Sequence, residues 1–136
     1  CREQFASALP PGTHGTTFGG NALACAAALS VLDVLEQEEL VAHAARLGAW
    51  FGPRLQELVS RHPRVLLGAR GMGLLQGVVL RPEYPVAMLL SALREQQVLA
   101  IAAGGNVLRL CPPLTITERE LEEGLSALDR VLQGLG

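Results

Sequence analysis

Apolar residues recur every three or four positions in three segments of the chain, which is the spacing of an amphipathic helix. One segment runs from about Glu39 to Ser60, with apolar positions at Leu40, Ala44, Leu47, Phe51, Leu55 and Leu58. A shorter one covers Val86 to Gln97. The third follows Thr117, and its stripe consists of Leu121, Leu125, Leu128, Leu132 and Leu135. The pattern predicts three helices that each bury one face.

Two local signals refine these helices. The run Thr117-Glu118-Arg119-Glu120 is a capping box, in which the Thr oxygen and the Glu carboxylate each accept a hydrogen bond from a free amide. Pro53 lies inside the helix that begins near Glu39, and a proline there removes one backbone hydrogen bond. We therefore expect a kink or a break near Gly48 to Gly52.

A fourth helix is expected over residues 21–37, with Asn21 as its cap. Its body, ALACAAALSVLDVLEQ, is rich in Ala and Leu, which are strong helix formers. Because its first two turns are apolar on nearly all sides, we expect this helix to be buried on several sides, between larger bodies. Cys25 within it is then a small buried hydrophobe rather than a nucleophile, and Cys111 is interpreted in the same way.

Short apolar runs predict strands. Val65–Leu67 and Leu74–Leu80 are separated by a glycine-rich bend, and Val98–Ala102 and Val107–Leu110 flank Gly104-Gly105-Asn106, a turn suited to a hairpin. The order helix, helix, strands, helix, strands, helix predicts an α+β domain in which helices cover a small antiparallel sheet.

Composition excludes several kinds of chemistry. The chain has 136 residues, and all eleven of its basic residues are arginines. Without a lysine it cannot form a Schiff base through a side chain, nor supply the lysine of a P-loop. Its 13 acidic residues outnumber the bases and aromatics are few, which argues against binding to nucleic acid. No apolar run approaches the roughly 18 residues of a membrane span.

The cysteines and the first residues indicate the redox setting of the protein and the extent of its polypeptide. Cys1, Cys25 and Cys111 are odd in number and widely spaced, which fits neither a disulfide framework nor a zinc site and favours a reducing, cytoplasmic setting. The chain begins without Met. About 60% of its residues are apolar or glycine, which is above the roughly 45–50% that is usual for soluble domains. It is therefore expected to be a piece of a longer polypeptide.

Two places could carry chemistry. The loop from Gly12 to Asn21 offers glycine amides, the hydroxyls of Thr16 and Thr17 and a helix start, which suit a phosphate or a carboxylate, although a plain linker is as consistent with its composition. Arg109 lies inside an apolar strand, where it either forms a structural salt bridge or binds a carboxylate through its two-pronged guanidinium.

The three histidines are scattered along the sequence and predict no metal site. His43 and His62 fall on a helix face and at a helix end, so we expect structural or solvated roles for them. No residue of this chain is expected to be catalytic by itself.

Three motifs resemble one enzyme family. They are Thr13-His14-Gly15-Thr16-Thr17-Phe18-Gly19-Gly20-Asn21, Arg70-Gly71-Met72-Gly73-Leu74 and Asn106-Val107-Leu108-Arg109-Leu110-Cys111-Pro112-Pro113-Leu114. All three are similar to segments of the class III, fold-type-I pyridoxal-phosphate aminotransferases, most of all to the acetylornithine enzymes. The likeness runs along essentially the whole chain.

The resemblance implies a division of the chain and roles for three residues. Residues 1–20 would be a loop left from the large domain and the dimer interface, and 21–136 the C-terminal small domain, with an interdomain helix at about 21–37. Thr17 would bind the cofactor phosphate across a subunit interface, Thr16 would lie by the substrate, and Arg109 would bind the substrate α-carboxylate. The lysine that holds the cofactor covalently belongs to the family's upstream part.

The resemblance also implies a function for the parent enzyme. It would convert N-acetylornithine and 2-oxoglutarate into N-acetylglutamate semialdehyde and glutamate in arginine biosynthesis, as a cytoplasmic homodimer, and this chain alone would be inactive. Two alternatives stay open at this point: a fragment of an ornithine, 4-aminobutyrate or succinyl-diaminopimelate aminotransferase, and a non-catalytic module for binding or assembly.

Overall fold

The structure is a computed structural model that describes residues 2–8 and 10–135; Cys1 therefore lies outside the described residues. The chain divides into two units, Cys1–Gln37 and Glu38–Gly136. The first unit contains the 3-10 helix η1 (Glu3–Ala8) and the helix α1 (Ala22–Gln37). The second contains α2 (Leu40–Arg61), β1 (Leu66–Met72), β2 (Leu75–Leu80), α3 (Val86–Glu95), β3 (Ile101–Ala103), β4 (Val107–Leu110) and α4 (Glu118–Leu135).

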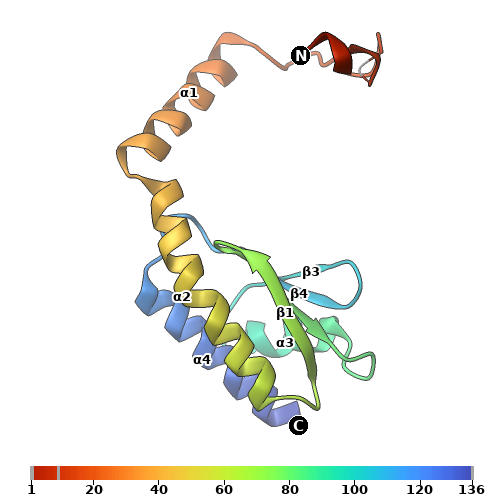
Figure 1. The fold of residues 1–136 in the computed structure, drawn as a ribbon, viewed down its shortest axis with the longest axis vertical. Coiled ribbons are helices and arrows are strands. Elements are labelled where there is room, and N and C mark those ends of the chain that lie inside the picture. The colour runs from red at the N-terminus through yellow and green to blue at the C-terminus, as the bar shows by residue number, and fades with distance from the viewer. Residues whose placement is uncertain (1, 9, 136) are drawn as a thin grey trace. The chain divides into compact units, whose positions relative to one another are not determined.

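One antiparallel sheet organises the second unit. Its strand order is β1-β2-β4-β3, and every neighbouring pair is antiparallel (Figure 1). The predicted hairpin around Gly104-Gly105-Asn106 is confirmed as β3 and β4. The Asn106 side chain supports this corner, because its amide accepts a hydrogen bond from the Val86 amide and donates to the carbonyls of Arg81 and Tyr84.

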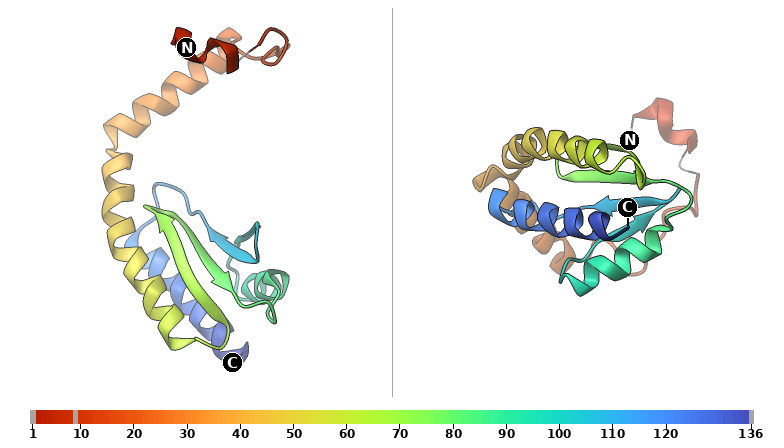
Figure 2. Two further views of the ribbon diagram at one scale, coloured as in Figure 1. Left: turned by 45° about the vertical axis from the view of Figure 1, so that its right-hand side comes forward. Right: turned by 90° about the horizontal axis from the view of Figure 1, so that it is seen from below.

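Three helices cover one face of this sheet. Figures 1 and 2 show α2 and α4 side by side along it, with α3 packed against α4 and the β3 and β4 strands. The core between helices and sheet consists almost wholly of leucines, including Leu55, Leu89 and Leu132. The predicted α+β fold, a small antiparallel sheet covered by helices, is therefore confirmed.

The capping box at the start of α4 is confirmed. The Glu120 amide donates to the Thr117 hydroxyl oxygen at 3.3 Å, and the Thr117 amide donates to the Glu120 carboxylate at 2.8 Å. The Thr117 hydroxyl also donates to that carboxylate at 2.7 Å, and these hydrogen bonds hold the pKa of Glu120 below its ordinary value. Four leucines of the predicted stripe are buried, and the last one, Leu135, is partly buried.

Two predictions about local structure are wrong, and the break considered near Pro53 is absent. Residues 68–72 are not a bend: β1 continues to Met72, because paired backbone groups in the ladder with β2 offset the weak strand preference of glycine. Pro53 does not break α2, since it removes one hydrogen bond while Phe51 and Leu55 on either side anchor the helix in the core. The first twenty residues also contain η1, which was expected to be loop.

The prediction that α1 is buried is also wrong for this chain. Asn21 caps α1 as predicted, with its side-chain oxygen 2.9 Å from the Ala24 amide. None of the residues of α1 is buried, however, and large apolar side chains such as Leu23 and Leu29 are exposed. Cys25 on α1 and Cys111 after β4 are both free and exposed. The apolar helix thus has no covering partner within the described part of the chain.

Asp129 on α4 is hydrogen-bonded to residues at the C-terminal end of α2. Its carboxylate accepts hydrogen bonds from His62 Nε2 at 2.6 Å and from the Arg61 guanidinium. Burial of the carboxylate raises its pKa, but the hydrogen bonds from His62 and Arg61 and the charge of Arg61 outweigh burial, so the pKa of Asp129 lies below its ordinary value of 3.8. The ionised form is therefore the one that stabilises the fold.

This arrangement predicts a pH-dependent loss of stability. Because the pKa is lowered on folding, the contribution of Asp129 is present above about pH 4 and is lost as the pH falls through the folded value. At pH 7 the Asp129→Asn variant should lower the free energy of unfolding by about 1 kcal/mol. Urea denaturation at pH 7 and pH 3 should show the difference from the wild type shrinking at pH 3. The exposed Glu57→Gln change on α2 is the control, and an equal loss at both pH values would contradict the prediction.

Candidate functional site

The loop before α1 is built from short side-chain turns. The Thr13 hydroxyl donates to the Pro10 carbonyl at 2.7 Å, and the Thr16 hydroxyl oxygen accepts from the Gly19 amide at 3.2 Å. A Cβ at position 19 would lie 2.2 Å from the Cγ2 of Thr16, so any other residue there requires the Thr16 side chain to rotate. The hydroxyls of Thr13 and Thr16 thus each close a short turn in the segment before α1.

Thr17 sits between these turns with its hydroxyl unengaged. The residue is exposed, and no described residue forms a hydrogen bond with its side chain. The helix α1 begins five residues later, at Ala22. Asn21 accepts a hydrogen bond from the Ala24 amide, and the amides of Ala22 and Leu23 have no partner within the helix. A free hydroxyl next to a helix N-terminus can donate to an anionic oxygen, which is chemistry suited to a phosphate.

Arg109 lies in the second unit, on β4. It pairs across the sheet with Gly77 of β2 and Ile101 of β3, and its side chain is exposed. None of the residues that the structure describes forms an ion pair or a hydrogen bond with its guanidinium. Of the two interpretations of Arg109, the structural salt bridge is therefore absent from the described part of the chain, and the guanidinium can meet a ligand.

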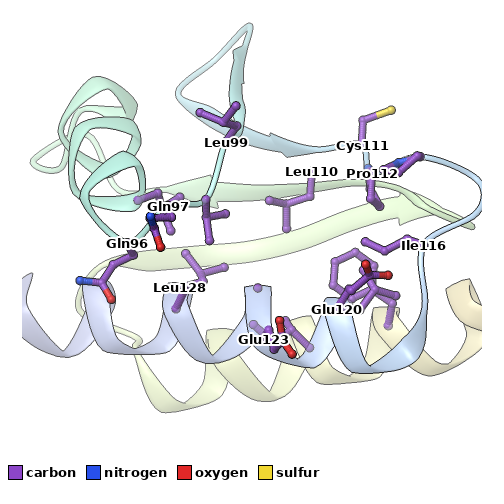
Figure 3. Close-up of a pocket in the computed structure, with 18 of the residues that line it drawn as sticks. Gln96, Gln97, Leu99, Leu110, Cys111, Pro112, Ile116, Glu120, Glu123 and Leu128 are labelled. Carbon is purple, nitrogen blue, oxygen red and sulfur yellow. The ribbon is translucent and has the colours of Figure 1, made fainter.

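A groove of the second unit lies at a different place. It has a volume of about 650 Å³ and lies between α4, the end of α3 and the turn after β4. In Figure 3 the side chains of Leu110, Ile116 and Leu128 point into it, whereas the Cys111 sulfur points away. Neither Arg109 nor the threonines of the loop line this groove. Its walls combine leucines and prolines with polar side chains at the rim, namely Gln96, Gln97, Glu120, Glu123 and Arg130.

His43 and His62 have structural partners, as predicted. His43 Nε2 hydrogen-bonds the Ile116 carbonyl at 2.9 Å, which ties α2 to the segment before α4, and His62 bonds Asp129. Within residues 2–8 and 10–135, no three His, Cys, Asp or Glu side chains gather in a way that could hold a metal ion.

The predicted site residues fall in separate units: Thr16 and Thr17 in the first, Arg109 in the second. Arg70 was not assigned a role, although it shares a row of the sheet with Arg109. The only sequence signal for Arg70 is the alternation of side chains between the two faces of a strand. This signal applies to Arg70 because β1 extends past Gly68 to Met72.

The chain was compared with known proteins. The model of the aminotransferase class-III family matches residues 1–132. The chain is 42% identical to an acetylornithine aminotransferase of Prochlorococcus marinus over 132 residues, and 42% identical to a succinylornithine transaminase of Yersinia pseudotuberculosis over 127 residues. These alignments cover 96% and 92% of this chain but 32% and 30% of the relatives.

Solved structures agree. The crystal structure of acetylornithine aminotransferase from Elizabethkingia anophelis is 34% identical, with a TM-score of 0.80 over 95% of this chain and 33% of that protein. An ornithine aminotransferase from Toxoplasma gondii, described with partial occupancy of PLP at its active site, is 35% identical with a TM-score of 0.81; it is covered to 31%, and this chain to 95%.

The chain thus spans about a third of the length of the relatives it matches. Among the described helices none is both long and apolar enough to cross a membrane. The family match extends over nearly all of the sequence, and it includes the threonine loop, the sheet and the Arg109 strand. On these grounds the chain belongs to the class-III aminotransferase family.

Proposed function

We propose that this chain is the C-terminal part, mainly the small domain, of an acetylornithine aminotransferase. The parent transfers the amino group of N-acetylornithine to 2-oxoglutarate, yielding N-acetylglutamate semialdehyde and glutamate, in the arginine biosynthesis of the cytoplasm. The observation that carries the proposal is the exposed, unpaired guanidinium of Arg109, which sits in the family motif on a rigid strand. The names of the relatives support the choice of substrate.

The residues present fit the anionic end of pyridoxal phosphate and not its reactive end. The free Thr17 hydroxyl suits a phosphate oxygen, and a hydrogen bond to a charged group contributes about 1.5–3 kcal/mol. The chain contains no lysine that could bind the cofactor covalently. The cofactor, when bound, supplies the electron sink for amino-group transfer. By itself this chain is therefore proposed to be inactive.

The proposed roles of the chain are binding and orientation. Arg109 holds the substrate α-carboxylate through two parallel hydrogen bonds, which fixes the direction of the substrate as well as its position. Thr16, whose hydroxyl accepts from the Gly19 amide, lies beside the bound acyl group. Thr17 serves the cofactor of a second subunit, and the uncovered apolar surface of α1 supports contact with such a subunit and with the large domain.

One alternative substrate class within the family, ornithine or another N-acylated ornithine, is supported by similar proteins. Ornithine aminotransferases from Plasmodium and Toxoplasma are structurally similar to the chain, and succinylornithine transaminases match it at 42% identity. The same three residues would then serve ornithine or another N-acylated ornithine. No described contact favours the 4-aminobutyrate or diaminopimelate substrates, or a non-catalytic module.

A chimeric enzyme tests the proposal. The matching C-terminal third of the Prochlorococcus acetylornithine aminotransferase is replaced by this chain, and transamination by 2-oxoglutarate is measured with N-acetylornithine, N-succinylornithine and ornithine. N-Acetylornithine should be the best substrate, and the isolated 136-residue chain should show no activity. Thr17→Val should weaken retention of pyridoxal phosphate by about tenfold, through the loss of one charged hydrogen bond.

Thr13→Val is the matched control, because the Thr13 hydroxyl bonds the Pro10 carbonyl within its own turn. It should leave cofactor retention unchanged. A folded chimera that retains the cofactor but transaminates none of the three amino donors would contradict the proposed function. Equal retention in the Thr17 and Thr13 variants would contradict the role of Thr17 alone.

A further inference from the structure

Asn21 forms hydrogen bonds with two different parts of the chain. Its side-chain oxygen accepts from the Ala24 amide at 2.9 Å, and its side-chain nitrogen donates to the Phe18 carbonyl at 2.6 Å. The first bond caps α1, because it satisfies an amide that has no partner within the helix. The second bond is not part of the cap. It attaches the residue that follows Thr17 to the start of α1.

The segment that the second bond spans is conformationally permissive. Gly19 and Gly20 lie between Phe18 and Asn21, and Gly20 adopts φ +74°, a conformation that glycine favours. Glycine loses more conformational freedom than any other residue when it is fixed in one conformation. Hydrogen bonds from side chains to the backbone offset part of this cost.

Packing does not hold the Thr17 backbone in this chain. Every residue from Pro10 to Val34 is exposed, so no buried apolar contact fixes the loop or the first turns of α1. Two hydrogen bonds bracket Thr17 instead. The Thr16 hydroxyl accepts from the Gly19 amide within the turn, whereas the Asn21 side chain joins the turn to α1.

The residue type at position 21 suits this second bond. Asn, Asp, Ser and Thr can each supply the oxygen that caps a helix. Of these four, Asn carries an N–H donor on an atom separate from its acceptor, and it carries no charge. An Asp at this position would lose the bond to the Phe18 carbonyl, and it would place a negative charge near the anion that the Thr17 hydroxyl suits.

We propose that Asn21 is a positioning residue for the phosphate contact of Thr17. By joining the Phe18 carbonyl to the first turn of α1, it fixes the backbone that carries the Thr17 hydroxyl before the cofactor binds. Binding then costs less conformational entropy, because the loop is already ordered. Asn21 acts through Thr17 and does not itself contact the cofactor. This inference rests on the proposed function, because it takes the ligand of Thr17 to be the phosphate of pyridoxal phosphate.

A double-mutant cycle in the chimera tests the role of Asn21. Asn21→Ser keeps an oxygen that caps α1 and loses the donor to the Phe18 carbonyl. The dissociation constant of pyridoxal phosphate is measured for the unmodified chimera, Asn21→Ser, Thr17→Val and the double variant. Asn21→Ser should weaken binding about fivefold when Thr17 is present, through the loss of one neutral hydrogen bond that orders the loop. In the Thr17→Val background its effect should be less than about twofold.

Two controls separate positioning from a general loss of structure. Pyridoxal, which lacks the phosphate, should bind the Asn21→Ser chimera as well as it binds the unmodified one. The helix content of the isolated chain, measured by circular dichroism, should stay unchanged, because Ser retains the cap. Ser30→Ala is the matched variant on α1: the Ser30 hydroxyl donates to the Ala26 carbonyl within the helix at 3.1 Å, and its removal should leave cofactor binding unchanged.

The other outcomes are distinct. Equal losses from Asn21→Ser with and without the Thr17 hydroxyl would show that Asn21 does not act through Thr17. An equal loss of pyridoxal binding, or a fall in helix content, would assign Asn21 a purely structural role. An active chimera that Asn21→Ser leaves unaffected refutes this inference alone. A chimera that shows the expected cycle but transaminates none of the three amino donors keeps the role of Asn21 and contradicts the proposed function.

Discussion

Replacing Gly48 by alanine is expected to lower the free energy of unfolding of this chain by about 3 kcal/mol. Gly48 lies in α2 directly beneath the β1–β2 turn, where a Cβ would approach the Gly73 Cα at 2.4 Å and its carbonyl carbon at 2.8 Å. Both atoms are backbone, so no side chain can move aside. Gly73 itself adopts φ +55°, a conformation that glycine tolerates best, so the turn has little freedom to retreat.

Gly52, one turn further along α2, provides the control. A Cβ there meets no atom within 4 Å apart from its chain neighbours, and the gain in helix preference of about 0.5–1 kcal/mol is offset by crowding against the ring of Pro53, so Gly52→Ala should leave the free energy of unfolding close to that of the wild type. Urea denaturation of both variants measures the difference. If Gly48→Ala were as stable as Gly52→Ala, the close packing of α2 on the turn would be contradicted.

The second large effect is expected at Arg109. In the chimera, Arg109→Lys should lower kcat/KM for N-acetylornithine by about 100-fold, because the ammonium keeps the charge but loses the two parallel hydrogen bonds to the carboxylate. The loss should appear mainly in KM, and 2-oxoglutarate should be affected as well, since it also carries an α-carboxylate. The midpoint of thermal unfolding should stay unchanged, because the guanidinium supports no contact within the described chain.

Arg94→Lys supplies the control for Arg109→Lys. It makes the same exchange at an exposed position in the last turn of α3, away from the strand that carries Arg109, and should leave both kinetic constants unchanged. A loss of less than about threefold in Arg109→Lys, with normal retention of the cofactor, would show that a single positive charge suffices. The two-point contact proposed for Arg109 would then be wrong.

Local signals in the sequence were sufficient for most elements. The predicted helix from Glu39 to Ser60 is α2, and the Thr117 capping box starts α4, because helix periodicity and caps depend on residues within one or two turns. The predicted bend between the first two strands was wrong because strand pairing depends on residues that are not neighbours in the sequence. Gly68 and Gly71 suggest a bend when considered alone, and only the ladder with β2 makes their segment a strand.

Burial was predicted less well than periodicity. The apolar character of α1 was recognised, but the described chain supplies nothing that covers it, so Cys25 is exposed. Pro53 shows the converse, since core contacts on both sides of it hold a helix that local preference would interrupt. Which apolar surface is covered depends on the partner surfaces that tertiary structure supplies.

The sequence by itself determined the fold class, the threonine loop, the Arg109 strand and the absence of lysine, because each follows from residue type and short-range spacing. Only the tertiary structure decided that Arg70 and Arg109 share a row across Gly77, that neither guanidinium pairs with an acidic side chain of the described residues, and that Gly48 lies against Gly73. These relations join residues 25 to 39 positions apart in sequence, and strand register and close packing set such distances, which no local pattern encodes.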